Sequence, residues 1–329
     1  MQLKLQEGKI VIRKLSVLAL SFFLMAMLSS TAFGATYPTQ PVNYLIAFSA
    51  GGESDITARM QQKYLEKELG VPVVMTYKVG GGGAVCWADL VRSKADGYII
   101  GGVNEPHTIL QPLQSKCGYE TEQIQRIALF QYTPCALIVR KDSQFKTLKD
   151  LIDFAKKYPG MITVGGSGSW ASTHFTTMLF EKAAGIKLTY IPFAGSGDTK
   201  PAILGGHVSA IVAHPTTVVT MKDDVRILAV AAETRSAAFP DVPTFKELGF
   251  PTVIEGSYRG VAVPPGTPKD IVDKLAAAFK KANEDPEFVK QMTSLGFDLV
   301  WKGPEEYENW IKGQTVYYRD LLKSLGYQN

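Results

Sequence analysis

The 329-residue sequence has only three cysteines and four histidines, and neither set has the spacing of a known functional site. Cys86, Cys117 and Cys135 are too few for a disulfide framework, and no C-x-x-C motif pairs them with a histidine as in a zinc site. One disulfide with a thiol left over is compatible with an oxidising compartment. The histidines lack H-E-x-x-H spacing, so we expect polar anchors or surface residues, and neither a metal nor a cofactor.

Templates for catalysis are also missing. The sequence contains no G-x-x-x-x-G-K-[ST] phosphate loop and no G-x-S-x-G nucleophile turn. The segment 166–171 fits G-x-G-x-x-A, but no acidic residue ends the next predicted strand, 188–193, where a ribose-binding carboxylate belongs. An exported α/β enzyme acting on a small carboxylate is the alternative to a binding protein. It requires an activated nucleophile or a paired acid and base, and we find neither.

Positive charge is concentrated at the N-terminus. Four basic residues and one acidic residue lie in residues 1–34, so the net charge of +4 falls to +1 without them. No Lys/Arg-rich stretch follows, and we therefore expect no nucleic-acid partner.

The first 34 residues have the pattern of a secretory signal. Arg13 and Lys14 precede an apolar run of 14 residues, and an A-x-G site ends at Gly34. A bilayer span needs about 20 apolar residues, and no cysteine is placed for a lipid anchor. We predict cleavage near Gly34/Ala35 and a periplasmic protein.

The remaining residues, about 295, exceed what one compact core usually holds, so we expect two lobes. Short apolar strands alternate with amphipathic helices, which predicts an α/β fold with largely parallel sheets. Residues 104–135 are assigned to a loop by default, and the tail after residue 263 is predicted to be mainly helical. Because no low-complexity linker separates the lobes, we expect the chain to cross between them more than once.

A strand followed by a small-residue turn and a helix occurs three times, after Phe48, Val164 and Phe193. Such turns leave backbone N–H groups unpaired at a helix N-terminus, where the helix dipole favours an anion. Ligands of open α/β sheets lie at the carboxyl ends of strands, which is where these turns fall. A small carboxylate is the predicted ligand. The structural alternative is that these glycines and serines only make good turns and caps.

An ordered set of motifs over nearly the whole mature chain resembles the tripartite tricarboxylate transporter receptor family, also called Bug. The set is Tyr37-Pro38-x-x-Pro41-Val42, Phe48-x-x-Gly51-Gly52-x-x-Asp55-x-x-Ala58-Arg59, Gly80 to Gly83, Asp96-Gly97-Tyr98, Gly166 to His174, Ile191-Pro192-Phe193-x-Gly195, Leu204-Gly205-Gly206, and Arg259 to Pro268.

The resemblance implies a two-lobed type 2 periplasmic-binding fold with a ligand cleft between the lobes. We place domain one at 36–137 plus 259–329, domain two at 138–258, and the signal peptide at 1–34. Members perform no chemistry and deliver mostly carboxylates to a two-component membrane permease. The ligand expected here is a di- or tricarboxylate, an amino acid or an aromatic acid. A binding protein that presents its ligand to a signalling system is a further alternative.

In this family the turns hold the ligand's carboxylates. The ligand-binding residues predicted for this chain are Phe48, Ser49, Ala50, Gly51, Gly52, Ser54, Asp55, Glu105, Gly166, Ser167, Gly168, Ser169, Trp170, Ser172, Thr173, Ala194, Gly195, Asp198 and Arg259.

Four of these residues have two interpretations each. We favour Asp55 as a helix cap paired with Arg59 over a ligand contact. Glu105 either meets a cationic group or lies on the rim, and Trp170 forms an aromatic wall or shields the hinge. Arg259, where the chain recrosses, competes with the neutral donors of the turns for the carboxylate.

Overall fold

The computed structural model describes residues 37–219, 221, 223–236 and 238–327. The predicted signal peptide at 1–34 lies outside the described residues. The chain divides into two compact units, 1–39 and 40–329, and every helix and strand described below lies in the second.

The first lobe is built on a six-stranded mixed sheet in the order β11-β4-β10-β3-β1-β2. Its strands are β1 (Val42–Ile46), β2 (Val73–Tyr77), β3 (Ile99–Glu105), β4 (Gln125–Pro134), β10 (Gly256–Val263) and β11 (Asp298–Lys302). The strands β1, β2 and β3 are parallel, whereas β10 runs antiparallel to both β3 and β4. Helical segments of this lobe are α2 (Glu53–Leu69), η1 (Gly81–Gly83), α3 (Ala84–Leu90), α4 (His107–Gln114), η2 (Thr121–Gln123), α9 (Lys269–Glu284), α10 (Pro286–Ser294) and α11 (Pro304–Ser324).

The second lobe is built on a five-stranded mixed sheet in the order β7-β6-β8-β5-β9. Its strands are β5 (Ala136–Arg140), β6 (Thr163–Gly166), β7 (Thr189–Pro192), β8 (Ala210–Ala213) and β9 (Val225–Val230). Its helices are α5 (Leu148–Lys157), α6 (Ser172–Ala184), α7 (Ser196–Leu204) and α8 (Pro215–Val219). A capping box opens α5, because the Thr147 hydroxyl accepts a hydrogen bond from the N–H of Asp150 and the Asp150 carboxylate accepts one from the N–H of Thr147.

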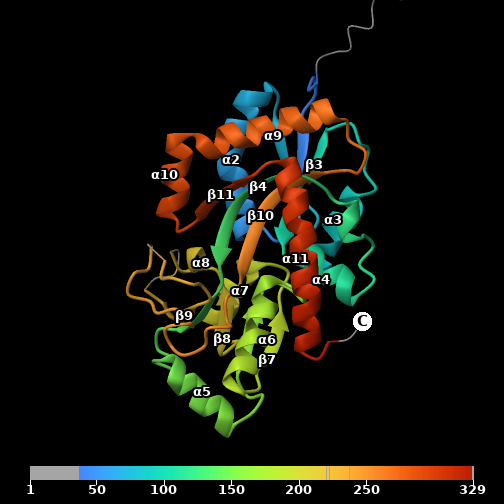
Figure 1. Cartoon of the computed structure of the whole chain (residues 1–329). Helices are drawn as coiled ribbons and strands as arrows, with labels where there is room; N and C mark the ends of the chain where they lie inside the picture. The colour runs from blue at the N-terminus through green and yellow to red at the C-terminus, as the bar shows by residue number, and fades with distance from the viewer. Residues whose placement is uncertain (1–36, 220, 222, 237, 328–329) are drawn as a thin grey trace, which may run out of the picture. The chain divides into compact units, whose positions relative to one another are not determined.

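The chain crosses between the two sheets at two adjacent segments, Pro134–Ala136 and Glu255–Gly256. β4 and β10 run side by side toward these crossovers (Figure 1). Backbone hydrogen bonds tie them together, since Cys135 N–H donates to the Glu255 carbonyl at 2.9 Å. The Glu255 carboxyl is buried between Gly256 N–H and the hydroxyl of Tyr318 on α11. Burial raises the pKa of Glu255 to about 8, although these two donors lower it.

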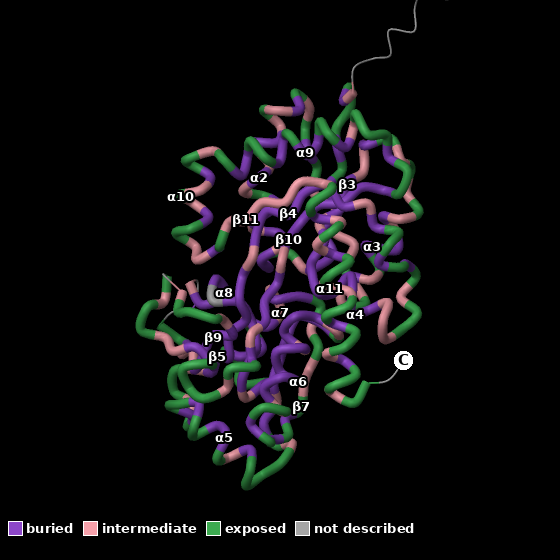
Figure 2. The backbone as a smooth tube through the Cα atoms, in the orientation of Figure 1, coloured by how far each residue is buried: buried purple, intermediate pink, exposed green. Residues whose placement is uncertain are grey.

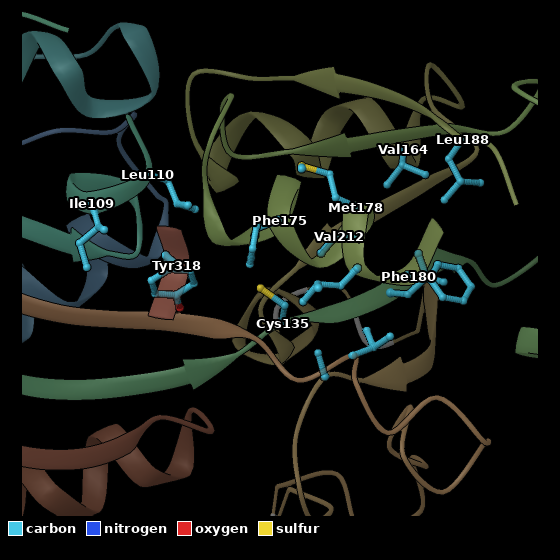
Figure 3. Packing of buried hydrophobic residues seen from close by; sticks show 14 of the residues in the cluster. Ile109, Leu110, Cys135, Val164, Phe175, Met178, Phe180, Leu188, Val212 and Tyr318 are labelled. Atoms are coloured by element: carbon cyan, nitrogen blue, oxygen red, sulfur yellow. The ribbon is translucent and has the colours of Figure 1, made fainter. Parts of the chain in front are cut away.

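Buried side chains form a core that continues from one lobe into the other. The buried stretches of the backbone follow both sheets, and α5 and α10 are largely exposed on their outer faces (Figure 2). Leu110 of the first lobe, Tyr318 of α11 and Phe175 of the second lobe all belong to this core (Figure 3). The Tyr318 ring meets that of Phe175 edge-on, with 5.5 Å between the centroids. The three cysteines are free thiols, two of them buried.

The structure corrects two expectations about secondary structure. Both sheets are mixed rather than largely parallel, because the returning strand β10 and the crossover strand β5 run against their neighbours. Residues 104–135 are not a loop, since they contain α4 and β4. The tail after residue 263 is mainly helical, as predicted, and it also contains the short strand β11, which pairs with β4. Polar residues and prolines interrupt the apolar periodicity of α4 and β4. Periodicity alone therefore does not predict this helix and this strand.

Candidate ligand-binding site

The turn after β1 touches the turn that opens α7 in the other lobe. Ser49 Oγ donates to Asp198 Oδ2 at 2.9 Å, and the Glu53 N–H donates to Ser196 Oγ at 3.3 Å. The approach is close enough to require glycine. A Cβ on Gly195 would lie 2.6 Å from Ser49 Oγ. Two of the three predicted turns therefore meet across the lobes.

A small cavity lies beside this contact. The space among its lining residues that no atom fills is about 260 Å³, part of it open to solvent. The lining is polar and comes from both lobes. It consists of Phe48, Ser54, Asn104, His107, Ser167, Ser196, His214, Ser257 and Arg259.

A buried charged cluster forms one side of the site. The Glu53 carboxylate, in the first turn of α2, pairs with Arg259 of β10 and contacts the hydroxyl of Thr216. His214 Nδ1 lies 2.8 Å from Glu53 Oε2. Glu53 is 3% exposed, and burial alone would raise its pKa, but Arg259, His214 and Thr216 together lower that pKa to about 2. Because His214 and Thr216 follow β8, the cluster joins the two lobes.

Several buried polar atoms of the cavity lack a hydrogen-bond partner among the described residues. They include Arg259 Nε, His107 Nδ1 and His214 Nε2. The pKa of His107 is lowered to about 3, first by burial and then by the positive fields of Arg259 and His214, so this imidazole is neutral at physiological pH. A buried group without a partner costs about 1–3 kcal/mol, so these atoms favour a polar guest.

The predicted residues fall into distinct places. Phe48, Ser54, Ser167 and Arg259 line the cavity. Those at the contact between the turns are Ser49, Ala50, Gly52, Gly195 and Asp198.

Asp55 is engaged within its own lobe. Its carboxylate accepts hydrogen bonds from Gly51 N–H at 2.8 Å and Tyr77 OH at 2.5 Å, and pairs with Arg59 at 2.7 Å. The expected pairing with Arg59 is confirmed, but the expected helix cap is wrong, because the cap position of α2 is Gly52 and Asp55 lies in the first turn of the helix. Asp55 does not line the cavity.

Thr173 acts behind the cavity rather than in it. Its side chain is fully buried, and its Oγ1 accepts a hydrogen bond from Ser167 N–H at 3.0 Å. The same hydroxyl is 3.0 Å from Tyr190 OH, so it fixes the position of Ser167. Gly166 has no room for a side chain beside Tyr190 and Thr173, and Ser172 is fully buried.

The remaining residues of the Gly/Ser-rich turn after β6 line a second pocket. Gly168, Ser169, Trp170 and Ala194 line it, opposite Gly80 to Gly82 of the first lobe. Trp170 has φ = 58° and contacts the rings of His174 and Tyr327. It therefore forms a wall of this pocket and does not line the cavity with Arg259.

The expectation for Glu105 is wrong. Glu105 is 1% exposed, and its carboxylate pairs with Arg126 at 2.9 Å and receives a hydrogen bond from Tyr307. It is neither on a rim nor available to a cationic ligand group.

The cavity and cluster also contain residues that were not among the predicted ligand-binding residues, namely Glu53, Asn104, His107, Ser196, His214, Thr216 and Ser257. Glu53 lies inside the predicted turn after Phe48, and Asn104 and His107 follow a predicted strand. The sequence positions of these three residues could therefore have indicated that they lie near the ligand. No motif in the neighbouring sequence distinguishes His214 or Ser257. Only the tertiary fold brings these two residues to the site.

Among the described residues, no helix is long and apolar enough to cross a bilayer. These residues also hold no group of three or more His, Cys, Asp or Glu side chains that could bind a metal ion.

Comparisons with known proteins agree on one family. Residues 57–327 match the family described as "Tripartite tricarboxylate transporter family receptor". The "UPF0065 protein in gbd 5'region" of Cupriavidus necator is 31% identical over 92% of each chain. "Protein BugT" of Bordetella pertussis is 26% identical over 95% of this chain and 98% of its own. The solved structure of the periplasmic binding protein BugD is similar with a TM-score of 0.84 and 29% identity, covering 88% of this chain and 99% of that one.

Proposed function

The chain belongs to the tripartite tricarboxylate transporter receptor family, and on this premise we propose that it captures a small carboxylate between its two lobes and delivers it to a two-component membrane permease. We further propose that residues 1–34 are removed on export to the periplasm. The lobe boundaries proposed are 36–137 with 259–329, and 138–258.

The cavity between the lobes is the observation that carries the proposal. Serine hydroxyls of both lobes and the Asn104 amide supply neutral donors, and Arg259 supplies a cationic one. Because the Glu53 carboxylate already neutralises the Arg259 guanidinium, the site is not a strong isolated positive charge. A carboxylate bound there receives charge-assisted hydrogen bonds yet leaves no unpaired buried cation when it departs. This balance suits a receptor that must release its cargo.

The ligand-binding residues proposed are those that line the cavity, with the contacting turns as the elements that close over it. Closure brings Ser54 of the first lobe and Ser167 of the second to one cavity. Capture by both lobes predicts a smaller radius of gyration with ligand bound, which solution scattering measures.

A thermal-shift screen tests the proposal. The purified mature protein is heated with mono-, di- and tricarboxylates, amino acids and aromatic acids, and the uncharged amide of each hit serves as its control. A ligand at a hundredfold excess over its Kd stabilises by ~2.7 kcal/mol and raises Tm. We expect a shift from a carboxylate and none from its amide. Equal shifts from both, or no shift from any carboxylate, would contradict carboxylate capture.

A further inference from the structure

The turn at residues 49–52, between β1 and α2, packs closely against the start of α7 in the other lobe. Ser49 Oγ donates to Asp198 Oδ2 at 2.9 Å. A Cβ on Gly52 would lie only 3.1 Å from Ser196 Oγ, so the backbone of the turn is itself in close contact with α7. A small displacement of this turn therefore breaks its fit to the second lobe.

The residues of this turn do little to hold it in place. Gly51 has a φ of 74°, and glycine loses more conformational freedom on ordering than any other residue. Gly52 is the N-cap residue of α2 and has no side chain that could accept a hydrogen bond from the free N–H groups of the helix. The hydrogen bond across the turn, from Gly52 N–H to the Ser49 carbonyl, is long at 3.3 Å. The order of the turn therefore depends on contacts from outside it.

Asp55, the third residue of α2, provides such a contact. Its Oδ2 accepts a hydrogen bond from Gly51 N–H at 2.8 Å, and the residue is 4% exposed. In a capping box, the third residue of a helix reaches back to the N–H of the N-cap residue. Here the carboxylate reaches one residue farther and fixes the centre of the turn. Because the acceptor is charged, this hydrogen bond is stronger than one between neutral groups.

Other residues of the first lobe hold Asp55 in place. Its second oxygen, Oδ1, accepts hydrogen bonds from Tyr77 OH at 2.5 Å and from Arg59 Nε at 2.7 Å. Arg59 also donates to the Tyr77 hydroxyl at 2.5 Å. Tyr77 is the last residue of β2 and pairs with Ile46 at the end of β1. Every member of this network lies in the first lobe, so the network forms without any contact with the second.

We propose that Asp55 is a positioning residue, which holds the turn at residues 49–52 in the conformation that fits α7 before the lobes meet. This inference rests on the proposed carboxylate capture between the lobes. Asp55 does not line the cavity, so it acts through the turn. Without Asp55 the turn has to be ordered at each closure, and ordering the backbone of one residue lowers the affinity for ligand by about five- to thirtyfold.

NMR relaxation on the ligand-free mature protein tests whether Asp55 orders the turn. We expect the backbone order parameter of Gly51 to be about 0.85 in the wild type and below about 0.6 in Asp55→Ala. Glu66→Ala is the matched control, because it also removes a carboxylate of α2 that accepts a backbone N–H, that of Val73 at 3.0 Å. It should leave the order parameter of Gly51 unchanged. A wild-type order parameter at Gly51 in D55A overturns the inference.

Calorimetry with malate, succinate, citrate and benzoate tests whether this order serves capture. We expect D55A to weaken every ligand that the wild type binds by one common factor of about five to thirty, and E66A to bind like the wild type. Removal of a negative charge would by itself strengthen the binding of an anion, so weaker binding is not a charge effect.

The outcomes for Asp55 and for carboxylate capture are distinguishable. Wild-type affinity in D55A, or an equal loss in D55A and E66A, overturns the inference and leaves carboxylate capture intact. If the wild type binds none of these acids, carboxylate capture fails, and the NMR result still decides whether Asp55 orders the turn.

Tyr77→Phe tests the same network while the carboxylate stays in place. It deletes one hydrogen bond to Oδ1 of Asp55 and keeps the bond from Gly51 N–H. We expect a smaller loss of order at Gly51, and a smaller loss of affinity, than in D55A. If D55A does not fold, Y77F decides the question: an order parameter and an affinity equal to those of the wild type would refute the proposal.

Discussion

Replacing Gly197 by alanine tests whether the lobes meet at the turns when ligand is bound. A Cβ on Gly197 would lie 2.7 Å from the Ala50 carbonyl oxygen in the other lobe, a separation that real Cβ atoms essentially never show. Both atoms belong to the ordered start of a turn or helix, so neither can rotate away. The two turns must separate, and the cost falls only on the closed state.

The size of the effect follows from that clash. Overpacking of one methyl group costs about 1–3 kcal/mol. This corresponds to binding weakened by about 5- to 150-fold. Folding should not suffer, because Gly197 lies in the first turn of α7 and alanine has a higher helix propensity than glycine by up to ~1 kcal/mol.

Calorimetry with the best carboxylate from the thermal-shift screen measures the loss, and denaturant unfolding without ligand measures stability. Gly313→Ala is the control, because its added Cβ has no heavy atom within 4 Å in the interior of α11. It should gain stability and keep wild-type affinity. Wild-type affinity in Gly197→Ala, with normal behaviour of the control, would refute closure through these turns.

Three further predictions concern charge, hydrogen bonding and processing. The pKa of Glu255 is about 8 in the folded state, above its value of about 4.5 in the unfolded state, so protonation of Glu255 stabilises the fold. This contribution to the free energy of unfolding is complete below about pH 4.5. It disappears as the pH rises through 8. At roughly 1.4 kcal/mol for each pKa unit, Glu255→Gln should flatten the loss of unfolding free energy between pH 6 and 8.5, and an unchanged slope would count against it. Ser167→Ala should weaken carboxylate binding by ~1.5–3 kcal/mol in calorimetry, whereas Arg259→Ala should not abolish it; the reverse ranking would make Arg259 the main anchor. N-terminal sequencing of periplasmic protein should begin near Ala35, and retention of residues 1–34 would contradict cleavage.

The sequence predicted the parts of the site that depend on local pattern. Glycine and serine after an apolar strand require a tight turn into a helix, and the turns at Phe48 and Phe193 do meet in the fold. Ser54 and Ser167 were predicted from their turns and line the cavity. Such features are visible because they are fixed by residues within one short segment.

Local sequence pattern does not predict which residues far apart in the chain pair with one another. Glu105 resembles an exposed loop residue until β4 brings Arg126 beside it. Glu53 is 161 positions from His214 and 206 from Arg259, and no spacing rule connects them. β4 was missed because Arg126 and Gln131 interrupt its apolar pattern, and both are buried only because partners from elsewhere satisfy them.

The position of β10 also governs the order in which the chain can fold. β10 lies between β3 and β4 and pairs with both, so the first 255 residues contain two strands with no shared neighbour. All strands of the second lobe, by contrast, lie within residues 136–230. During synthesis from the N-terminus, the second sheet has all its strands while β3 still lacks a neighbour on one side and β4 on both, since β10 and β11 come later. Such open strand edges are prone to pairing with other chains. A chain threaded through a membrane therefore cannot complete its first lobe until its last quarter has emerged.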